Sequence, residues 1–270
     1  MVIGDIIKEL QSYLDRTEIF VILEFVLDKN KTEILTNLET CVNDDDKEKI
    51  FKMARRRVNK EPLQYITHNQ YFFGNKFYVN ENVLIPRADT EILVEEVLKS
   101  VTGNENILDL CTGSGCIAIS LKKANEALNV SASDISTNAL TVAMINAKIN
   151  NADVNFVKSD LFDNINKKYD IIVSNPPYIK KCDMKILQEE VKHEPILALD
   201  GGNSGLEYYE KIIEQAKKYL TDKGVIALEI GYNQAEDVSN LLIKNNYADI
   251  KVIKDYGNND RAIIAKAICT

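Results

Sequence analysis

Apolar residues recur at helical spacing through the first third of the chain. A helix is predicted where they return every three or four positions, as they do at Ile3, Ile6, Ile7, Leu10 and Leu14. The same spacing returns over 19–27, and a charged, helix-like segment covers about 44–60. We therefore expect a small helical N-terminal domain.

A β-rich piece follows these helices. Aromatic residues at 71–73 run into Gly74-Asn75 and then into 77–79, a pattern typical of a β-hairpin. Further on, Asp89 or Thr90 is placed to cap a helix that runs to about residue 101. The chain divides near residue 85, and the expected domains are 1–80, helical with a hairpin linker, and 81–270.

Strand and helix patterns alternate from residue 106, which predicts an α/β layered sheet. The seven strand candidates are 106–111, 129–133, 154–158, 169–174, 224–230, 247–255 and 261–267. No helix pattern separates the last two, so we expect a terminal hairpin with one antiparallel strand. Such an ending differs from that of a dinucleotide-binding Rossmann domain, whose first half would look the same.

Composition and charge narrow the class of protein. The 270 residues are 45% hydrophobic and 27% charged, as in an ordinary globular protein. No apolar run is long enough to cross a bilayer and no signal peptide is recognisable, so we expect a cytoplasmic protein without membrane contact. The net charge of −8 argues against broad nucleic-acid binding.

The thiols and imidazoles predict no metal site. The two histidines are His68 and His193, and the five cysteines form no CxxC pair and fit reduced thiols. One basic cluster is either a docking patch or, as we favour, a solvated helix face. It comprises Lys52, Arg55, Arg56, Arg57 and Lys60.

The strand candidate at 169–174 stops abruptly at Asn175-Pro176-Pro177-Tyr178. Neither proline can donate a ladder hydrogen bond, and ligands of open α/β sheets bind beyond such strand ends. Asn175 offers a carbonyl acceptor and an NH2 donor, and Tyr178 offers a ring with a polar tip. Together they could hold a planar group that carries an NH2. A plain strand-to-turn junction is the alternative.

A glycine-rich turn and two further acids complete the candidate site. The run 109–115 contains Gly113 and Gly115, which allow a tight turn and a close backbone approach to a ligand. The phosphate loop of ATPases is excluded because its GxxxxGK[ST] motif is absent. Asp134 after the second strand suits ribose hydroxyls, and Asp160 after the third could receive an adenine NH2. Helix capping by either acid is the alternative.

Together, Asp109 with its glycine loop, Asp134, Asp160 and NPPY resemble the S-adenosylmethionine-dependent methyltransferases of the seven-stranded class. NPPY is similar to the branch that methylates amino groups of DNA adenine, RNA guanine or protein glutamine. Further segments resemble the peptide chain release factor N5-glutamine methyltransferases, and they lie in both domains. These segments are 61–66, 84–91, 193–195, 198–206, 229–234 and 255–261.

The resemblance implies methyl transfer from S-adenosylmethionine to the glutamine amide of a Gly-Gly-Gln motif in bacterial class I release factors. The helical domain would grip the factor, with no direct nucleic-acid partner. The implied cofactor-binding residues are Asp109, Cys111, Thr112, Gly113, Ser114, Gly115, Asp134, Asp160, Leu161 and Asn175. The implied substrate-binding residues are Asn175, Pro176, Pro177 and Tyr178, of which Asn175, Pro176 and Tyr178 are catalytic.

Two departures from the family pattern stand out. Cys111 occupies a position that is usually glycine, and 86–91 reads PRADTE where the family has a PRPETE-like segment. We expect cofactor binding to survive, with a redox-sensitive Cys111 as the less favoured reading. Two rival functions stay open: a nucleic-acid amino-methyltransferase and a non-catalytic cofactor-binding protein.

Overall fold

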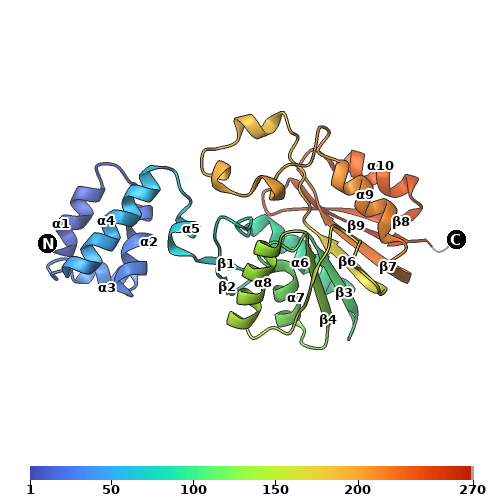
Figure 1. Cartoon of the computed structure of the whole chain (residues 1–270), viewed down its shortest axis with the longest axis horizontal. Helices are drawn as coiled ribbons and strands as arrows, with labels where there is room; N and C mark the ends of the chain where they lie inside the picture. The colour runs from blue at the N-terminus through green and yellow to red at the C-terminus, as the bar shows by residue number, and fades with distance from the viewer. Residues whose placement is uncertain (269–270) are drawn as a thin grey trace. The chain divides into compact units, whose positions relative to one another are not determined.

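The computed structural model describes residues 1–268 and consists of two compact units (Figure 1). The helical unit comprises Met1–Asn69 together with Gln188–His193. The sheet unit comprises Gln70–Leu187 and the chain from Glu194 onward. The predicted hairpin therefore belongs to the sheet unit, and the functional boundary at residue 80 stays a prediction. Cys269 lies outside the described residues.

The helical unit has the amphipathic helices that the apolar spacing predicts. Ile6, Leu10, Ile19 and Leu23 are fully buried in its core. Side chains of Asp15 and Asn30 cap two of the helices through capping boxes. The helices are α1 (Ile3–Leu10), α2 (Arg16–Leu27), α3 (Lys31–Thr36), α4 (Asp44–Val58) and α5 (Leu63–Thr67).

Part of the basic cluster on α4 is structural. Arg57 forms ion pairs with Glu18 of α2 and with Glu190, and its side chain is only 12% exposed. Arg56 forms an ion pair with Glu61. The cluster is thus not simply a solvated helix face, because these two guanidinium groups hold segments of the unit together.

The sheet unit contains a seven-stranded mixed sheet, which confirms the predicted fold class. Its strand order is β5-β4-β3-β6-β7-β9-β8; β9 is antiparallel to both neighbours and the other pairs are parallel. The terminal hairpin is thus confirmed. The strands are β3 (Asn106–Leu110), β4 (Asn129–Asp134), β5 (Asn155–Lys158), β6 (Tyr169–Ser174), β7 (Leu220–Glu229), β8 (Tyr247–Lys254) and β9 (Asp260–Ala267).

Successive residues of the central strands point to opposite faces of this sheet and build two cores. Ile107 and Ile171 pack with α6, α7 and α8, whereas Leu108 and Ile172 pack with α9 and α10 (Figure 1). Because both faces are covered, these strands read as continuous apolar runs. The helices are α6 (Glu91–Ser100), α7 (Cys116–Ala124), α8 (Thr137–Ile149), α9 (Glu207–Ala216) and α10 (Ala235–Lys244).

Short elements connect the larger helices and strands. The hairpin consists of β1 (Gln70–Phe72) and β2 (Asn75–Phe77), and the Glu91 carboxylate accepts a hydrogen bond from its Phe73 N–H at 2.7 Å. A 3-10 turn, η1 (Ala88–Thr90), leads into α6. Three more 3-10 turns lie between β6 and α9, namely η2 (Asp183–Ile186), η3 (Val191–His193) and η4 (Ile196–Ala198).

The predicted capping of α6 is wrong. Thr90 occupies the N-cap position with φ −68° and ψ −19°, but its side chain makes no capping hydrogen bond. Asp89 lies within η1 and forms an ion pair with Arg261. The physical reason is that the 3-10 turn continues directly into the helix. Thr90 therefore lacks the extended backbone that turns a cap side chain back toward the first helical N–H groups.

Candidate active site

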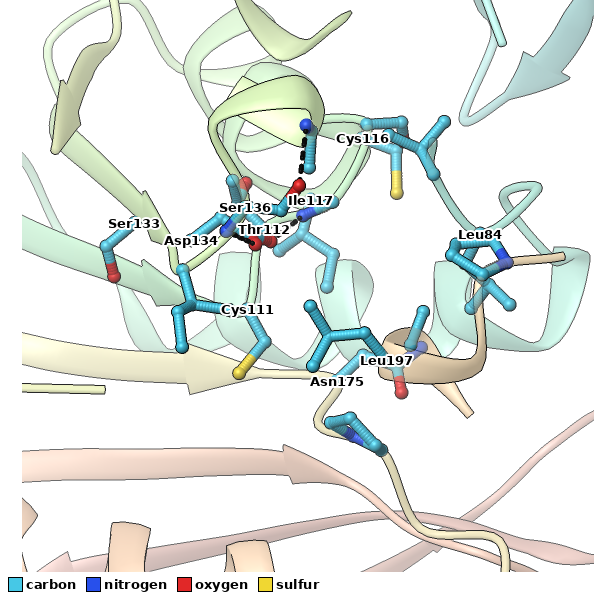
Figure 2. A pocket seen from close by; sticks show the side chains of 18 of the residues that line it. Leu84, Cys111, Thr112, Cys116, Ile117, Ser133, Asp134, Ser136, Asn175 and Leu197 are labelled. Carbon is cyan, nitrogen blue, oxygen red and sulfur yellow. Dashed lines mark hydrogen bonds between the residues drawn. The ribbon is translucent and has the colours of Figure 1, made fainter. Parts of the chain in front are cut away.

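A cavity of about 1030 Å³, part of it open to solvent, lies at the carboxyl ends of β3, β4, β5 and β6. Figure 2 shows Cys111, Asp134 and Asn175 around it. Four predicted site residues, Asp109, Gly115, Pro176 and Tyr178, do not line the cavity themselves. The predicted residues that do are Cys111, Thr112, Gly113, Ser114, Asp134, Asp160, Leu161, Asn175 and Pro177.

Asp109 stabilises the glycine loop through hydrogen bonds. Its Oδ2 accepts hydrogen bonds from the Thr112 hydroxyl at 2.6 Å and from the Ala118 N–H at 3.2 Å. Its Oδ1 is buried without a partner among residues 1–268. Complete burial raises the pKa of Asp109 to about 7, against the lowering effect of these hydrogen bonds. Asp109 therefore shapes the loop that faces the cavity.

Three residues of the loop adopt left-handed backbone conformations: Cys111 (φ +59°), Gly113 (φ +55°) and Gly115 (φ +81°). A Cβ at Gly115 would also lie 3.1 Å from the Cβ of Ala143, so this glycine is required for loop and helix to pack. Cys111 carries the strain that glycine avoids. Burial raises the pKa of its thiol, which keeps it protonated and argues against a redox-sensitive role.

Neither Asp134 nor Asp160 caps a helix. The Asp134 carboxylate accepts hydrogen bonds from the N–H groups of Gly113 and Ser136, both at 2.9 Å, while the Ser136 side chain caps α8. Residues after Asp160 form a turn, and its exposed carboxylate has no hydrogen bond to the rest of the described chain. Both carboxylates therefore retain acceptor capacity toward the cavity.

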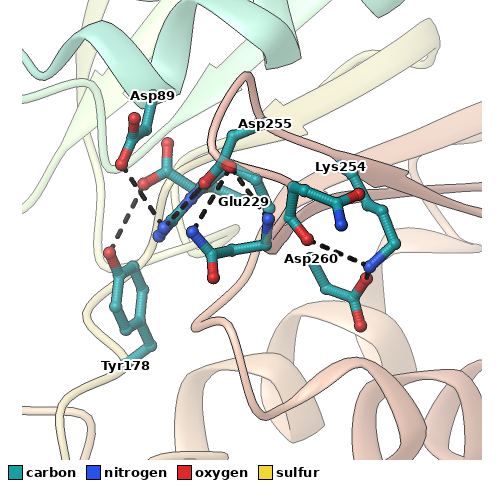
Figure 3. Close-up of polar contacts among 9 residues, drawn as sticks. Asp89, Tyr178, Glu229, Lys254, Asp255 and Asp260 are labelled. Carbon is teal, nitrogen blue, oxygen red and sulfur yellow. Dashed lines mark hydrogen bonds and ion pairs between the residues drawn. The ribbon is translucent and has the colours of Figure 1, made fainter.

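The NPPY segment is held from several sides. Asn175 donates from Nδ2 to the Thr90 hydroxyl at 3.4 Å. The Tyr178 hydroxyl donates to Glu229 at 3.4 Å (Figure 3), and the Tyr178 carbonyl accepts from Gln234 Nε2 at 3.1 Å. A Cβ at Gly201 would lie 2.7 Å from the Tyr178 Cα. The segment is thus a packed support for the Asn175 amide and more than a strand-to-turn junction.

Sequence reasoning missed several residues that shape the site. The buried Glu194 forms an ion pair with Arg87 and accepts the Ile85 N–H at 3.0 Å, which joins two segments of the cavity wall. Thr90 was expected only as a helix cap, and Gln234 was given no role of its own. Each belongs to a motif that carries the family resemblance, at 84–91, 193–195 or 229–234. The motifs were the available signal, but they do not reveal which side chains meet.

The sheet order with an antiparallel β9, together with a glycine-loop cavity at the carboxyl edge, defines a methyltransferase fold. The family model for a methyltransferase small domain matches residues 87–204, and that for the PrmC N-terminal domain matches 5–67. A methyltransferase from Pyrococcus furiosus is 22% identical, with a TM-score of 0.58 over 84% of this chain and 100% of its own. This similarity concerns the fold.

Curated relatives specify the family. The release factor glutamine methyltransferase of Clostridium acetobutylicum is 38% identical over 96% of this chain and 94% of its own length. That of Fusobacterium nucleatum is 45% identical over 89% of this chain and 70% of its own. The chain belongs to the release factor glutamine methyltransferase family.

Proposed function

We propose that this protein transfers a methyl group from S-adenosylmethionine to the side-chain amide nitrogen of the glutamine in the Gly-Gly-Gln motif of peptide chain release factors. The observation that carries the proposal is one cavity with Asp134 and Asp160 on its wall and the Asn175 amide at its edge. Two family matches across both units support the same function. Such a substrate implies a cytoplasmic reaction.

The cavity residues fit the proposed cofactor. Asp134 offers carboxylate oxygens to ribose hydroxyls, Asp160 offers its exposed carboxylate to the adenine NH2, and the glycine loop allows close approach. When bound, S-adenosylmethionine supplies an electrophilic methyl group on a sulfonium. No group of three or more Cys, His, Asp or Glu side chains that could hold a metal occurs in residues 1–268.

The task of the protein is to position a poor nucleophile. An amide nitrogen shares its lone pair with the carbonyl, so the reacting nitrogen must be aligned and its developing positive charge stabilised. Asn175 Oδ1 and the Pro176 carbonyl would accept the two N–H bonds of the substrate amide, while the Tyr178 ring holds its plane. Such acceptors strengthen as charge develops on nitrogen, and the proton leaves to water after transfer.

The assignment of Asn175 is tested by substitution. Asn175→Ala is expected to leave the cofactor Kd within a few-fold and to lower kcat by about 10²-fold or more, the typical loss for one transition-state hydrogen bond in an active site. Isothermal titration and single-turnover transfer of labelled methyl measure the two quantities. Near-normal turnover would remove Asn175 from the mechanism.

The substrate is tested with a purified release factor, labelled S-adenosylmethionine and mass spectrometry of the Gly-Gly-Gln peptide. We expect one added methyl on the glutamine and none on a factor with Gln→Ala at that position. Label that appears instead on RNA or DNA and survives protease treatment would favour a nucleic-acid amino-methyltransferase. Cofactor binding without transfer to any acceptor would indicate a non-catalytic protein.

A further inference from the structure

A buried asparagine on α8 is hydrogen-bonded to two parts of the sheet unit that lie far from it in the sequence. Asn146 is fully buried. Its Oδ1 accepts the Tyr78 N–H at 2.6 Å, and its Nδ2 donates to the carbonyls of Tyr78 and Ser114, both at 2.9 Å. A flipped amide would place its oxygen against two carbonyl oxygens. The network therefore holds the Asn146 side chain in one orientation.

The Ser114 carbonyl of the glycine loop obtains its hydrogen bond from Asn146. Ser114 lies just before the N-cap of α7, is 2% exposed and lines the cavity. In a longer helix this carbonyl would accept the Ala118 N–H, but that N–H donates to Asp109 instead. A buried carbonyl without a partner is costly. The Asn146 NH2 thus takes the place of the missing helical donor.

The hydrogen bond to Ser114 lies where α8 packs against the glycine loop. Ala143 precedes Asn146 by three residues, so the two lie on the same side of the helix. A Cβ added at Gly115 would lie 3.1 Å from the Ala143 Cβ. Loop residues 112–114 line the cavity, whereas Asn146 does not. The Asn146 side chain therefore influences the cavity through the loop.

The other two hydrogen bonds of Asn146 hold the segment 76–82, which leads from β2 to the wall of the same cavity. Residues 82–84 belong to that wall. The helix α8 lies beside the β1–β2 hairpin (Figure 1), and Asn150 at its C-terminal end donates to the Lys76 carbonyl at 2.9 Å. In the described chain Asn150 makes no hydrogen bond to the glycine loop. Asn146 joins the segment and the loop.

We infer that Asn146 is a positioning residue that fixes the glycine loop for cofactor binding and links the loop to the segment 76–82. The inference rests on the proposed function, since it concerns the loop assigned to S-adenosylmethionine. Without the Asn146 amide, the Ser114 peptide group would have to turn toward another donor, and the loop would move with it. Only part of the molecules would then hold the loop in the binding conformation, which weakens the apparent affinity.

The test compares Asn146→Ala with Asn150→Ala. Both variants lose an amide that holds the segment 76–82, but only the first loses a hydrogen bond to the glycine loop. In Asn146→Ala we expect the Kd for S-adenosylmethionine to rise about tenfold, as for one lost hydrogen bond to a buried group. In Asn150→Ala it should stay within about twofold. Isothermal titration well below each Tm measures both. Equal Kd values in the two variants would overturn the inference.

Hydrogen exchange in the wild type provides a second test that does not require a variant to fold. If Asn146 joins the loop to Tyr78, adding S-adenosylhomocysteine should slow exchange of the Tyr78 N–H several-fold, although Tyr78 does not line the cavity. The amides of β8 are the control, because no hydrogen bond of the described chain joins β8 to the loop. NMR measures both. Unchanged exchange at Tyr78, or equal slowing in β8, would contradict the link.

Cofactor affinity separates this inference from the proposed function. The Kd requires no methyl acceptor, so the comparison holds whichever NH2 group the wild type methylates. A wild type that does not bind S-adenosylmethionine would overturn both. If the wild type binds the cofactor and Asn146→Ala binds it equally well, the proposed function stands and the role of Asn146 is refuted.

Discussion

At the scale of single residues, Cys111 occupies a position that is usually glycine in the family, and its backbone conformation is one that favours glycine. Cys111 is held at φ +59° between a buried strand and the glycine loop. A side chain in this region of φ and ψ is strained by about 1–2 kcal/mol relative to glycine. The loop keeps its geometry despite this strain because glycines occupy its other two left-handed positions, 113 and 115.

Comparing Cys111→Gly with Cys111→Ala isolates that strain. Both variants lose the sulfur, but only glycine relaxes the backbone, so we expect Cys111→Gly to be more stable than Cys111→Ala by about 1 kcal/mol. Urea unfolding monitored by circular dichroism measures the difference. An Ala variant at least as stable as the Gly variant would show that the loop is not strained at this residue.

At the scale of elements, the segment before α9 presses directly on the NPPY loop. Gly201 allows its backbone to approach Tyr178, where any Cβ would lie 2.7 Å from the Tyr178 Cα. A Cβ atom this close would force the backbone to move. The backbone concerned is that of the NPPY segment, which contains the proposed acceptor Asn175. The fold thus ties the position of Asn175 to a segment that follows it by 26 residues.

Gly201→Ala is therefore expected to lower kcat by about tenfold or more, since small displacements of reacting groups are costly. The control is Gly103→Ala, because a Cβ at Gly103 meets no atom within 4 Å. Steady-state methyl transfer measures both. Equal activity in the two variants would show that the loop tolerates displacement.

The end of β7 also makes stability depend on pH. Burial raises the pKa of Glu229 from 4.5 to about 7, so between these values the folded protein holds a proton that the unfolded chain has lost. Stability contributed by this group is therefore greatest below about pH 4.5 and falls as pH rises to about 7. Above that pH the ionised, buried carboxylate costs its full desolvation.

Glu229→Gln removes this titration. We expect the Tm of Glu229→Gln relative to wild type to be higher at pH 8 than at pH 5, where the wild-type side chain is already neutral. Differential scanning calorimetry at the two pH values measures the shift. A Tm difference that does not change with pH would mean that Glu229 titrates near its ordinary value.

At the scale of the whole molecule, the two units suggest a division of labour. The helical unit matches a family model for an N-terminal domain, and its ion pairs join α2, α4 and the segment Gln188–His193 through Arg57. If this unit binds the release factor body, as the family resemblance implies, distorting the unit should weaken recognition of the intact factor and leave the methyl-transfer step unchanged.

Arg57→Ala tests this proposal. Removing the guanidinium leaves Glu18 and Glu190 unpaired, so we expect KM for intact release factor to rise several-fold while kcat/KM for a short Gly-Gly-Gln peptide changes by less than about twofold. Lys49→Ala is the control, because that exposed lysine pairs only within its own helix turn. Equal losses on factor and peptide would contradict a recognition role.

Patterns among residues close in sequence predicted most of the fold and of the candidate site. The apolar runs placed all seven strands to within a few residues, and the missing helix between the last two strands indicated the antiparallel β9. Carboxyl ends of parallel strands meet at one edge, so the glycine loop, Asp134, Asp160 and Asn175 were expected together, and they line one cavity. The side-chain chemistry at the strand ends and the spacing of apolar residues were sufficient to predict these features.

Side-chain partners distant in sequence were decided only by tertiary structure. Thr90 reads as a helix cap, yet its hydroxyl accepts a hydrogen bond from Asn175, because the 3-10 turn before α6 changes its backbone. Likewise, Asp134 binds the Gly113 N–H and leaves the capping to Ser136. The sequence by itself determined the sheet and the chemistry at its edge. The partner of the Asn175 amide, Thr90, lies 85 residues away in the chain, and only packing brings the two side chains together.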